Sequence, residues 1–235
     1  MSSESVPYKY KLYSYFRSSC SARVRIAAHL KGIELEYAFI HLVKAEQNSS
    51  AYHVLNPSES VPTLIVSNGQ TGEEITKIRQ SVAILEYFEE TRPELPQLLP
   101  PLEDPIARAR VRELVNIISN DVQPPTNLRI LNFIKPRGIE ANEWQQHFMN
   151  LGFRAYDDLL KLYAGKYSVG DQISLADCVL APAVDGALRF GVKVEQDFPN
   201  VWRVWTNISE VEAFQQGRWN AQEDTPDELR LKSKE

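Results

Sequence analysis

The sequence has little cysteine and histidine and no long apolar run. Its 235 residues include two cysteines, Cys20 and Cys178, and four histidines. Two cysteines cannot build a disulfide framework, and neither residue type recurs at the spacing of a zinc site, so we expect no metal. No apolar stretch approaches the ~18 residues that a membrane helix needs, and the N-terminus lacks the pattern of a secretory signal. We therefore expect a cytoplasmic protein without a membrane partner.

The sequence also lacks the motifs of several large enzyme classes. It contains no Gly-x-Gly-x-x-Gly, no phosphate loop ending in Gly-Lys-Ser/Thr and no His-Glu-x-x-His. A net charge of -5 without a basic tract argues against nucleic acid as a partner. What remains is an ordinary globular composition, with 43% hydrophobic and 24% charged residues, in a chain long enough for two modest domains.

Residues 8–92 alternate between strand-like and helix-like hydrophobic spacing. The pattern predicts strands at 11–16, 35–40, 62–66 and 74–78, helices at 22–30 and 81–90, and a short helix within 44–51. Gly32 is placed to end the first helix, and Ser81 to cap the last one. Because a helix joins the first two strands, a right-handed crossover would make them parallel. The order βαβαββα predicts an α/β domain.

The second half of the chain is different. Five prolines between positions 93 and 105 exclude a regular element, so we expect a linker at 93–105. Apolar residues at helical spacing then predict helices at 106–122, 143–164 and 202–214, and one that Ser174 opens, with Asp177 in a variant of the capping box. We expect an all-helical domain at 106–223 and a loose, charge-rich tail at 224–235.

Three hydroxyls and one thiol stand where the first strand gives way to the first helix. They belong to Ser18, Ser19, Cys20 and Ser21. Such a junction combines side-chain donors, free backbone N–H groups and the positive end of a helix dipole, and this combination stabilises a bound anion. The alternative is that these serines merely cap the helix.

Short motifs along nearly the whole chain resemble those of one family. They are Tyr13-Ser-Tyr-Phe-Arg-Ser-Ser-Cys-Ser21, Arg23-Val-Arg-Ile-Ala27, Leu55-Asn-Pro57, Val61-Pro-Thr-Leu64, Gln80-Ser81, Glu89-Glu-Thr-Arg-Pro93, Gln123-Pro124, Asn127-Leu128, Val169-Gly-Asp171 and Ala176-Asp177. With them the chain resembles the cytosolic glutathione transferases, and its serine-rich opening resembles the zeta class, which includes maleylacetoacetate isomerase. The resemblance implies a thioredoxin-like α/β N-terminal domain, an all-α C-terminal domain and a homodimer. The class usually has Trp before Arg23, where this chain has Ala22, so the cleft there would be wider or differently shaped.

The resemblance implies that the bound anion is the thiolate of glutathione. A thiol of pKa ~8.5 is only slightly ionised at neutral pH, and lowering that pKa by about two units requires ~2.7 kcal/mol. One or two hydroxyl hydrogen bonds at about 1.5–3 kcal/mol each, with about 0.5–1 kcal/mol from the helix N-terminus, supply that amount. In the resembling family a serine of this motif faces the sulfur, so Ser18, Ser19 and Cys20 are the catalytic candidates, with Ser18 first.

Cys20 has more than one interpretation. A thioredoxin-type Cys-x-x-Cys would need a second cysteine at position 23, where Arg23 stands, so disulfide exchange is disfavoured. An inert or modulating thiol and direct participation in the reaction both stay open. Cys178, in an apolar helix, is expected in the core.

The resemblance also implies a set of glutathione-binding residues. They are Ser18, Ser19, Cys20, Ser21, Arg23, Gln47, Val61, Pro62, Gln80, Ser81, Gln123, Asn127, Leu128 and Arg129. Val61 would offer its backbone N–H and C=O before a cis proline, and Ser81 would hold the γ-glutamyl carboxylate at a helix start. Arg23 could contribute charge or act as an i,i+4 partner on its helix. Arg189 would bind a carboxylate of the second substrate through its guanidinium fork, with a surface salt bridge as the rival interpretation.

The activity that the resemblance implies is a glutathione-dependent cis–trans isomerisation. It would convert maleylacetoacetate, a small electrophilic diacid, to fumarylacetoacetate in phenylalanine and tyrosine breakdown, with glutathione transferase activity at the same site. Two alternatives stay open. One is a detoxifying transferase of broad range, which Ala22 leaves open, and the other is a glutathione-transferase-like module that binds without turnover.

Overall fold

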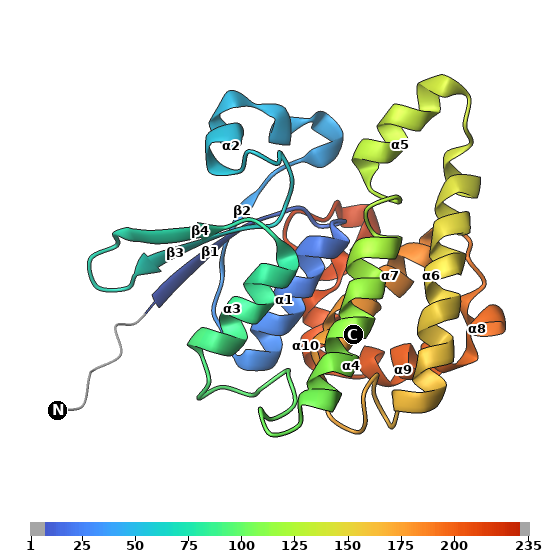
Figure 1. Cartoon of the computed structure of the whole chain (residues 1–235). Helices are drawn as coiled ribbons and strands as arrows, with labels where there is room; N and C mark the ends of the chain where they lie inside the picture. The colour runs from blue at the N-terminus through green and yellow to red at the C-terminus, as the bar shows by residue number, and fades with distance from the viewer. Residues whose placement is uncertain (1–7, 231–235) are drawn as a thin grey trace. The chain divides into compact units, whose positions relative to one another are not determined.

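The computed structural model describes residues 8–230 and divides the chain into two compact units. The N-terminal unit comprises Met1–Pro96 together with Gln216–Glu235, and the helical unit comprises Gln97–Gln215 (Figure 1). The sequence predicted a helical domain that continues to residue 223. The division differs from this prediction because the chain after residue 215 returns to the N-terminal unit.

A four-stranded sheet in the order β2-β1-β3-β4 forms the centre of the N-terminal unit. Its strands are β1 (Tyr8–Ser14), β2 (Glu36–Phe39), β3 (Thr63–Asn68) and β4 (Glu74–Ile78). β1 pairs with β2 in parallel, as predicted from the crossover, while β3 runs antiparallel to both β1 and β4. The predicted strands are therefore all present, with shifts of a few residues at their ends.

Two helices pack on one side of this sheet and enclose its main core. These helices are α1 (Ser19–Lys31) and α3 (Ser81–Thr91), and Figure 1 shows them together on one side of the sheet with α2 (Ser50–Leu55) on the other. The core between sheet and helices is formed by Tyr10, Leu12, Val24, Ala28, Leu64, Val66, Ile84 and Phe88. Gly32 ends α1 at φ 68°, a left-handed conformation that favours glycine.

Two local predictions in this unit need correction. The short helix expected within 44–51 is replaced by the 3₁₀ turns η1 (Leu42–Lys44) and η2 (Glu46–Asn48), and α2 follows them with Ser49 as its N-cap. The N-cap of α3 is Gln80 and not Ser81. Ser81 is already inside the helix, and its hydroxyl accepts a hydrogen bond from Arg23 instead of capping the backbone.

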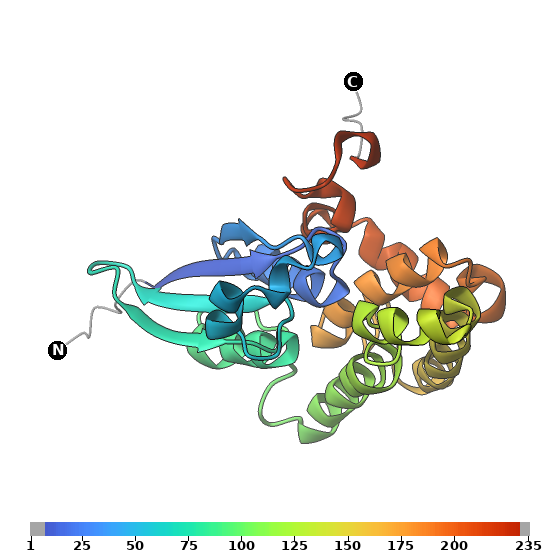
Figure 2. The ribbon, with the colours of Figure 1, turned by 90° about the horizontal axis from the view of Figure 1, so that it is seen from above.

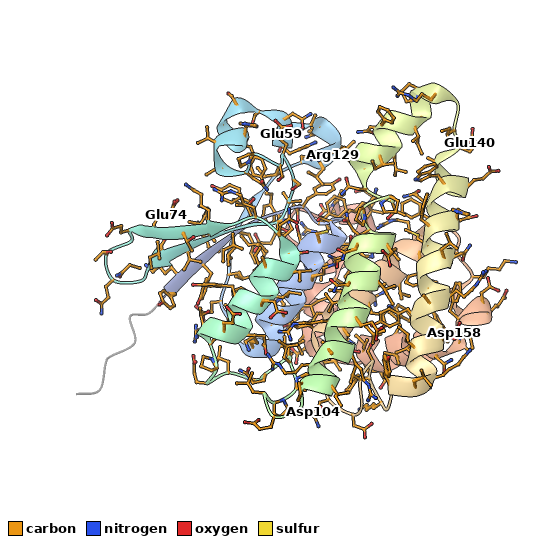
Figure 3. The ribbon with its side chains drawn as sticks, in the orientation of Figure 1. Glu59, Glu74, Asp104, Arg129, Glu140 and Asp158 are labelled. Atoms are coloured by element: carbon orange, nitrogen blue, oxygen red, sulfur yellow. The ribbon has the colours of Figure 1, made fainter. Side chains whose placement is uncertain are left out.

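The helical unit is built from one run of helices after the proline-rich segment. They are α4 (Pro105–Asn116), the π-helix η3 (Ile117–Val122), α5 (Leu128–Ile134), the 3₁₀ turn η4 (Lys135–Arg137), α6 (Ala141–Tyr163), α7 (Leu175–Arg189), α8 (Val194–Asp197), α9 (Pro199–Ser209) and α10 (Glu212–Gly217). Asp104 caps α4 by accepting a hydrogen bond from the Ala107 N–H at 2.9 Å (Figure 3). The predicted capping box of Ser174 and Asp177 is confirmed at the start of α7.

The sequence missed three features of the helical unit. The helix predicted at 106–122 changes to π geometry at Ile117, and α5 was not predicted. The single helix predicted at 202–214 is wrong, because the chain forms α9 and then α10. Cys178 is fully buried in α7, as expected.

The segment 216–230, called here the C-terminal strap, is ordered by its own side chains. It contains the 3₁₀ turns η5 (Trp219–Ala221) and η6 (Asp227–Leu229). The Thr225 hydroxyl donates to the Trp219 carbonyl at 2.6 Å, and the Gln222 amide donates to the carbonyls of Gln216 and Arg218 at 2.8 and 2.7 Å. Figure 2 shows the strap, in red, next to the blue ribbon of β1 and α1. The prediction of a loose tail is wrong for residues 224–230, and residues 231–235 lie outside the described residues.

Candidate functional site

Ser18 is the N-cap of α1. Its backbone is extended (φ -71°, ψ 113°), and its Oγ accepts a hydrogen bond from the Ser21 N–H at 3.1 Å. The Ser18 N–H in turn donates to the Tyr15 carbonyl at 2.9 Å, which closes the turn between β1 and α1. A serine hydroxyl holds one hydrogen and two lone pairs, so a hydroxyl that accepts the cap bond still has its hydrogen to donate to a ligand.

The first turn of α1 provides further donors. Ser19 and Cys20 are partly exposed, and the N–H groups at a helix start have no partner within the helix. This turn contains no acidic residue, so nothing within it neutralises the positive end of the helix dipole. Ser21 is fully buried, and its Oγ has no hydrogen-bond partner within residues 8–230. The turn is therefore suited to an anion.

Arg23 connects the start of α1 to the start of α3. It is 2% exposed, and its Nη1 donates to the Ser81 Oγ at 3.1 Å. Its Nε has no hydrogen-bond partner in the part of the chain that the structure describes. The sequence left open whether Arg23 contributes charge or pairs with a residue four positions away on its own helix. The second interpretation is wrong, because the partner of Arg23 is Ser81, which lies on α3. The guanidinium places positive charge beside Ser81.

The turn before β3 carries a cis peptide bond between Val61 and Pro62, as the resemblance implied. Two side chains of the preceding segment hold this turn. The Tyr52 hydroxyl donates to the Ser60 carbonyl at 2.8 Å, and the Asn56 amide donates to the same carbonyl at 2.7 Å. Both side chains also lie within 3.0–3.1 Å of the Thr63 hydroxyl. Tyr52 and Asn56 thus hold the chain at Ser60, before Val61, and at Thr63, after Pro62.

The remaining predicted residues of the N-terminal unit are less constrained. Gln80 is exposed, and its side chain makes no cap bond to the backbone of α3. Gln47 lies in η2 with its Oε1 buried and without a hydrogen-bond partner among residues 8–230. Ala22 is 3% exposed, so this small residue is covered and does not by itself line an open surface.

The predicted residues of the helical unit lie at helix ends. Gln123 follows η3, and its N–H donates to the Ile118 carbonyl at 3.0 Å. Asn127 caps α5 by accepting from the N–H of Arg129, which lies with Leu128 in the first turn of this helix (Figure 3). Arg189 is the exposed last residue of α7, with its guanidinium 5.4 Å from the centre of the Phe190 ring.

Arg25 is a buried cation that sequence reasoning missed. Its guanidinium donates to the Ser14 Oγ at 2.9 Å and to the carbonyls of Tyr15, Phe16 and Gly217 at 3.4, 3.2 and 3.0 Å. Complete burial lowers the pKa of Arg25 to about 10, which leaves it charged at neutral pH. The signal that could have found it is the run Val24-Arg25-Ile26-Ala27-Ala28, in which Arg25 is the one charged residue among four apolar ones.

The described chain contains neither a metal cluster nor a membrane span. Within residues 8–230, no three His, Cys, Asp or Glu side chains group to hold a metal ion. No helix in this range is both long and apolar enough to cross a membrane.

Comparison with known proteins decides the family. Profiles described as the glutathione S-transferase N-terminal and C-terminal domains match residues 17–91 and 144–212. A maleylacetoacetate isomerase of Aspergillus fumigatus is 49% identical over 96% of each chain. The isomerase of Rattus norvegicus is 45% identical over 93% of this chain and 96% of its own. The chain belongs to the zeta-class glutathione S-transferase family.

Solved structures agree with this zeta-class assignment. A maleylacetoacetate isomerase from Anaeromyxobacter dehalogenans, solved with glutathione in its active site, has a TM-score of 0.84 and 37% identity, covering 93% of this chain and 99% of that one. A maleyl pyruvate isomerase, described as a bacterial zeta-class enzyme, has a TM-score of 0.82 and 38% identity, covering 92% and 100%. The expected fold, a thioredoxin-like domain with an all-α domain, is confirmed.

The structure brings part of the predicted set together in this zeta-class protein. Within the N-terminal unit, the Arg23–Ser81 hydrogen bond joins the starts of α1 and α3, and Tyr15, Phe16, Tyr52 and Val61 form one buried cluster. The start of α1, the cis-proline turn and the start of α3 are therefore connected. Sequence reasoning missed the supporting residues Tyr52 and Asn56, although Asn56 lies in the quoted motif Leu55-Asn-Pro57.

Proposed function

We propose that this zeta-class protein is a glutathione-dependent isomerase that converts maleylacetoacetate to fumarylacetoacetate, with glutathione transferase activity at the same site. The maleylacetoacetate isomerases at 49% and 45% identity and the glutathione-bound structure at 37% identity support this activity. The observation that carries the proposal is the first turn of α1, where the Ser18 hydroxyl and free N–H groups meet with no acidic residue.

Glutathione would bind along the edge of the N-terminal unit formed by these turns. Its sulfur would accept from the Ser18 hydroxyl as a thiolate, with Ser19, Cys20 and Ser21 around it. Its cysteinyl backbone would pair with the N–H and C=O of Val61, as a short added strand.

The γ-glutamyl carboxylate of glutathione would bind beside Ser81, where the Arg23 guanidinium and the free backbone amides at the start of α3 supply positive charge and hydrogen-bond donors. Further contacts from Gln47, Pro62, Gln80, Gln123, Asn127, Leu128 and Arg129 stay predictions.

The reaction that follows from a bound thiolate consumes no glutathione. The sulfur adds to the electron-poor cis alkene, a C–S bond forms, and the alkene electron pair moves to the conjugated carbonyl as an enolate. Rotation about the new single bond is easy. The enolate then returns its electron pair, the C–S bond breaks, and the trans alkene leaves. The protein contributes thiolate stabilisation and positioning, with Arg189 proposed for a substrate carboxylate.

A coupled assay with glutathione and a cis diacid such as maleylacetone tests the proposal. Isomerisation with the thiol concentration unchanged supports the isomerase. Loss of one thiol per product would instead indicate a broad-range transferase, and glutathione binding without turnover would indicate a binding module. Failure to bind glutathione at all would contradict the proposal.

We also propose that the protein is a homodimer and works in the cytoplasm, as the family resemblance implies. Light scattering on the purified full chain would give twice the chain mass if the dimer is correct, and a single chain mass would contradict it.

A further inference from the structure

The backbone just before Ser18 is held by a residue from the far end of the chain. The Phe16 N–H donates to the Asp224 Oδ2 at 2.8 Å, across 208 positions of sequence. On its other side, the Phe16 carbonyl accepts from the Arg25 Nη2 at 3.2 Å. The Tyr15 carbonyl accepts both from Arg25 at 3.4 Å and from the Ser18 N–H at 2.9 Å. The peptide groups that lead into Ser18 are therefore fixed from two directions.

The C-terminal strap also fixes Arg25 itself. The Arg25 Nε donates to the Gly217 carbonyl at 3.0 Å. Gly217 lies so close to α1 that a Cβ there would come within 2.5 Å of the Ile26 Cγ1 and 3.0 Å of the Ile26 backbone nitrogen. A side chain at position 217 would thus push the strap away from α1.

Apolar side chains of the strap complete the attachment. Trp219 and Leu229 pack against the cluster of Tyr15, Phe16, Tyr52 and Val61. This cluster contains the turn before Ser18 and the residue before the cis proline. The strap therefore contacts the turn before Ser18 through Asp224, and it packs against the cluster that also contains Val61.

Asp224 is half-satisfied in a way that suits a positioning role. Its Oδ2 is used by the Phe16 N–H, whereas its Oδ1 is buried without a hydrogen-bond partner within residues 8–230. Most buried polar atoms have a hydrogen-bond partner, so an oxygen without one calls for an explanation. Here the bond that is made is the one to the backbone two residues before Ser18.

We propose that Asp224, acting with Arg25, is a positioning residue that holds the turn before Ser18 so that the Ser18 hydroxyl and the first amides of α1 stay directed at the glutathione sulfur. Asp224 touches neither the sulfur nor the second substrate in this scheme. The inference rests on the proposed function, because it assumes that the sulfur binds at the start of α1.

Two variants of Asp224 distinguish its hydrogen bond to the Phe16 backbone from the effect of its negative charge. Asp224→Ala removes the acceptor and the charge, whereas Asp224→Asn removes the charge and keeps an oxygen that can accept from the Phe16 N–H. The readouts are the pKa of bound glutathione, from thiolate absorbance, and the kcat and KM of isomerisation. Asp227→Ala is the matched control, because the Asp227 side chain is 93% exposed on the same strap.

We expect Asp224→Ala to raise the pKa of the bound thiol by about one unit, which lowers the thiolate fraction roughly tenfold where the thiol is mostly protonated, and to raise the KM for glutathione. Asp224→Asn and Asp227→Ala should resemble the wild type. A lowered thiol pKa, equal in Ala and Asn, would overturn positioning in favour of a through-space charge effect. Reduced unfolding stability with an unchanged thiol pKa would reduce Asp224 to a structural residue and also overturn the inference.

A second variant covers the case in which Asp224→Ala does not fold. Leu229→Ala loosens the strap at a half-buried apolar contact, and it should raise the thiol pKa in the same direction by a smaller amount. An unchanged thiol pKa in a folded Leu229→Ala protein would contradict the inference. The wild type is measured first. If it neither binds glutathione nor isomerises the substrate, the proposed function and this inference both fail. If the wild type is active and the strap variants leave the thiol pKa and the kinetics unchanged, only the inference fails.

Discussion

Ser18 caps α1, and this cap bond is compatible with the anion-binding role that the sequence presented as the alternative. Its Oγ caps α1 by accepting from the Ser21 N–H, and its hydrogen stays available for an anion at the same helix start. The sequence could predict the residue type and its place at a helix boundary. It could not predict the direction of the hydrogen bond, because that depends on the φ and ψ of the turn closed by Tyr15.

Ser18→Ala tests whether this hydroxyl stabilises the thiolate. We expect the pKa of bound glutathione to rise by about one to two units, because one hydrogen bond to a charge of about 1.5–3 kcal/mol is lost. Thiolate absorbance against pH measures the shift. Loss of the cap also costs ~1 kcal/mol of stability. Asp104→Ala removes a cap at α4 and should cost a similar amount without moving the thiol pKa. An unchanged thiol pKa in Ser18→Ala would exclude the role.

Tyr156 gives a prediction on pH dependence. It is fully buried, its hydroxyl donates to the Ala176 carbonyl at 3.3 Å and contacts the Ser168 Oγ at 3.1 Å, and burial together with the Asp177 charge raises its pKa well above 10.0. The folded protein therefore keeps the phenol proton at a pH where the unfolded chain releases it. The free energy of unfolding must fall as pH rises above about 10.

Tyr156→Phe isolates this contribution. At neutral pH the variant should be less stable by about 1–3 kcal/mol, since the groups that Tyr156 contacts lose their partner. The gap between the two proteins should narrow above about pH 10, by up to ~1.4 kcal/mol per pH unit, because only the wild type carries this titrating phenol. Urea unfolding at neutral and alkaline pH measures both gaps, and a gap independent of pH would contradict the assignment.

At the scale of elements, the π-helix η3 places Gln123 and depends on a glycine of α6. A Cβ at Gly152 would lie 2.1 Å from the Val122 Cγ2, so α6 and η3 approach too closely for a side chain. Apolar spacing alone predicts a continuous helix through residue 122, because the buried residues Val115, Ile118 and Val122 keep the three- and four-residue spacing of an α-helix. The inserted turn is visible in the bond from the Gln123 N–H to the Ile118 carbonyl, which sequence patterns do not report.

Gly152→Ala should destabilise the protein by about 1–3 kcal/mol, because Val122 is stiff at χ1 and must move with its backbone. Gly186→Ala is the matched control in α7, where a Cβ would meet the Arg189 Nη2 at 3.8 Å. There the exchange should be neutral or stabilising by about 0.5–1 kcal/mol, as for glycine in a helix interior. The midpoints of urea unfolding compare the two variants, and equal midpoints would contradict the close approach of α6 and η3 at Gly152.

Other elements show where sequence patterns succeed and fail. The four strands and the helices α1 and α3 were predictable from local alternation or helical periodicity, whereas the segment from η1 to α2 was not, because its turns are too short for a periodic signal. α5 was missed since its seven residues are too short for a periodic signal. The order of residues 224–230 was missed because Gln222 and Thr225 satisfy carbonyls only once the strap has folded on itself.

At the scale of the whole molecule, residues 8–96 and 216–230 belong to one compact unit although they are far apart in sequence. The residues of the first turn of α1 are local in sequence, and the resemblance could identify them. Arg25 lies inside the quoted motif Arg23-Val-Arg-Ile-Ala27, but nothing in that motif shows that its side chain turns back to the carbonyls of Tyr15 and Phe16. Asp224 lies in no quoted motif, and its contact with Phe16 spans 208 positions. Sequence motifs therefore offer candidates for ligand contact, but they do not show which distant side chains hold the backbone of those candidates.

We propose that the start of α1 holds glutathione as a thiolate. The direct measurement is a pH titration of thiolate absorbance for glutathione bound to the wild-type protein. We predict that the bound thiol ionises well below the ordinary value of about 8.5, so that most of it is thiolate at neutral pH. Bound glutathione with an unshifted pKa, or no binding of glutathione, would contradict the account.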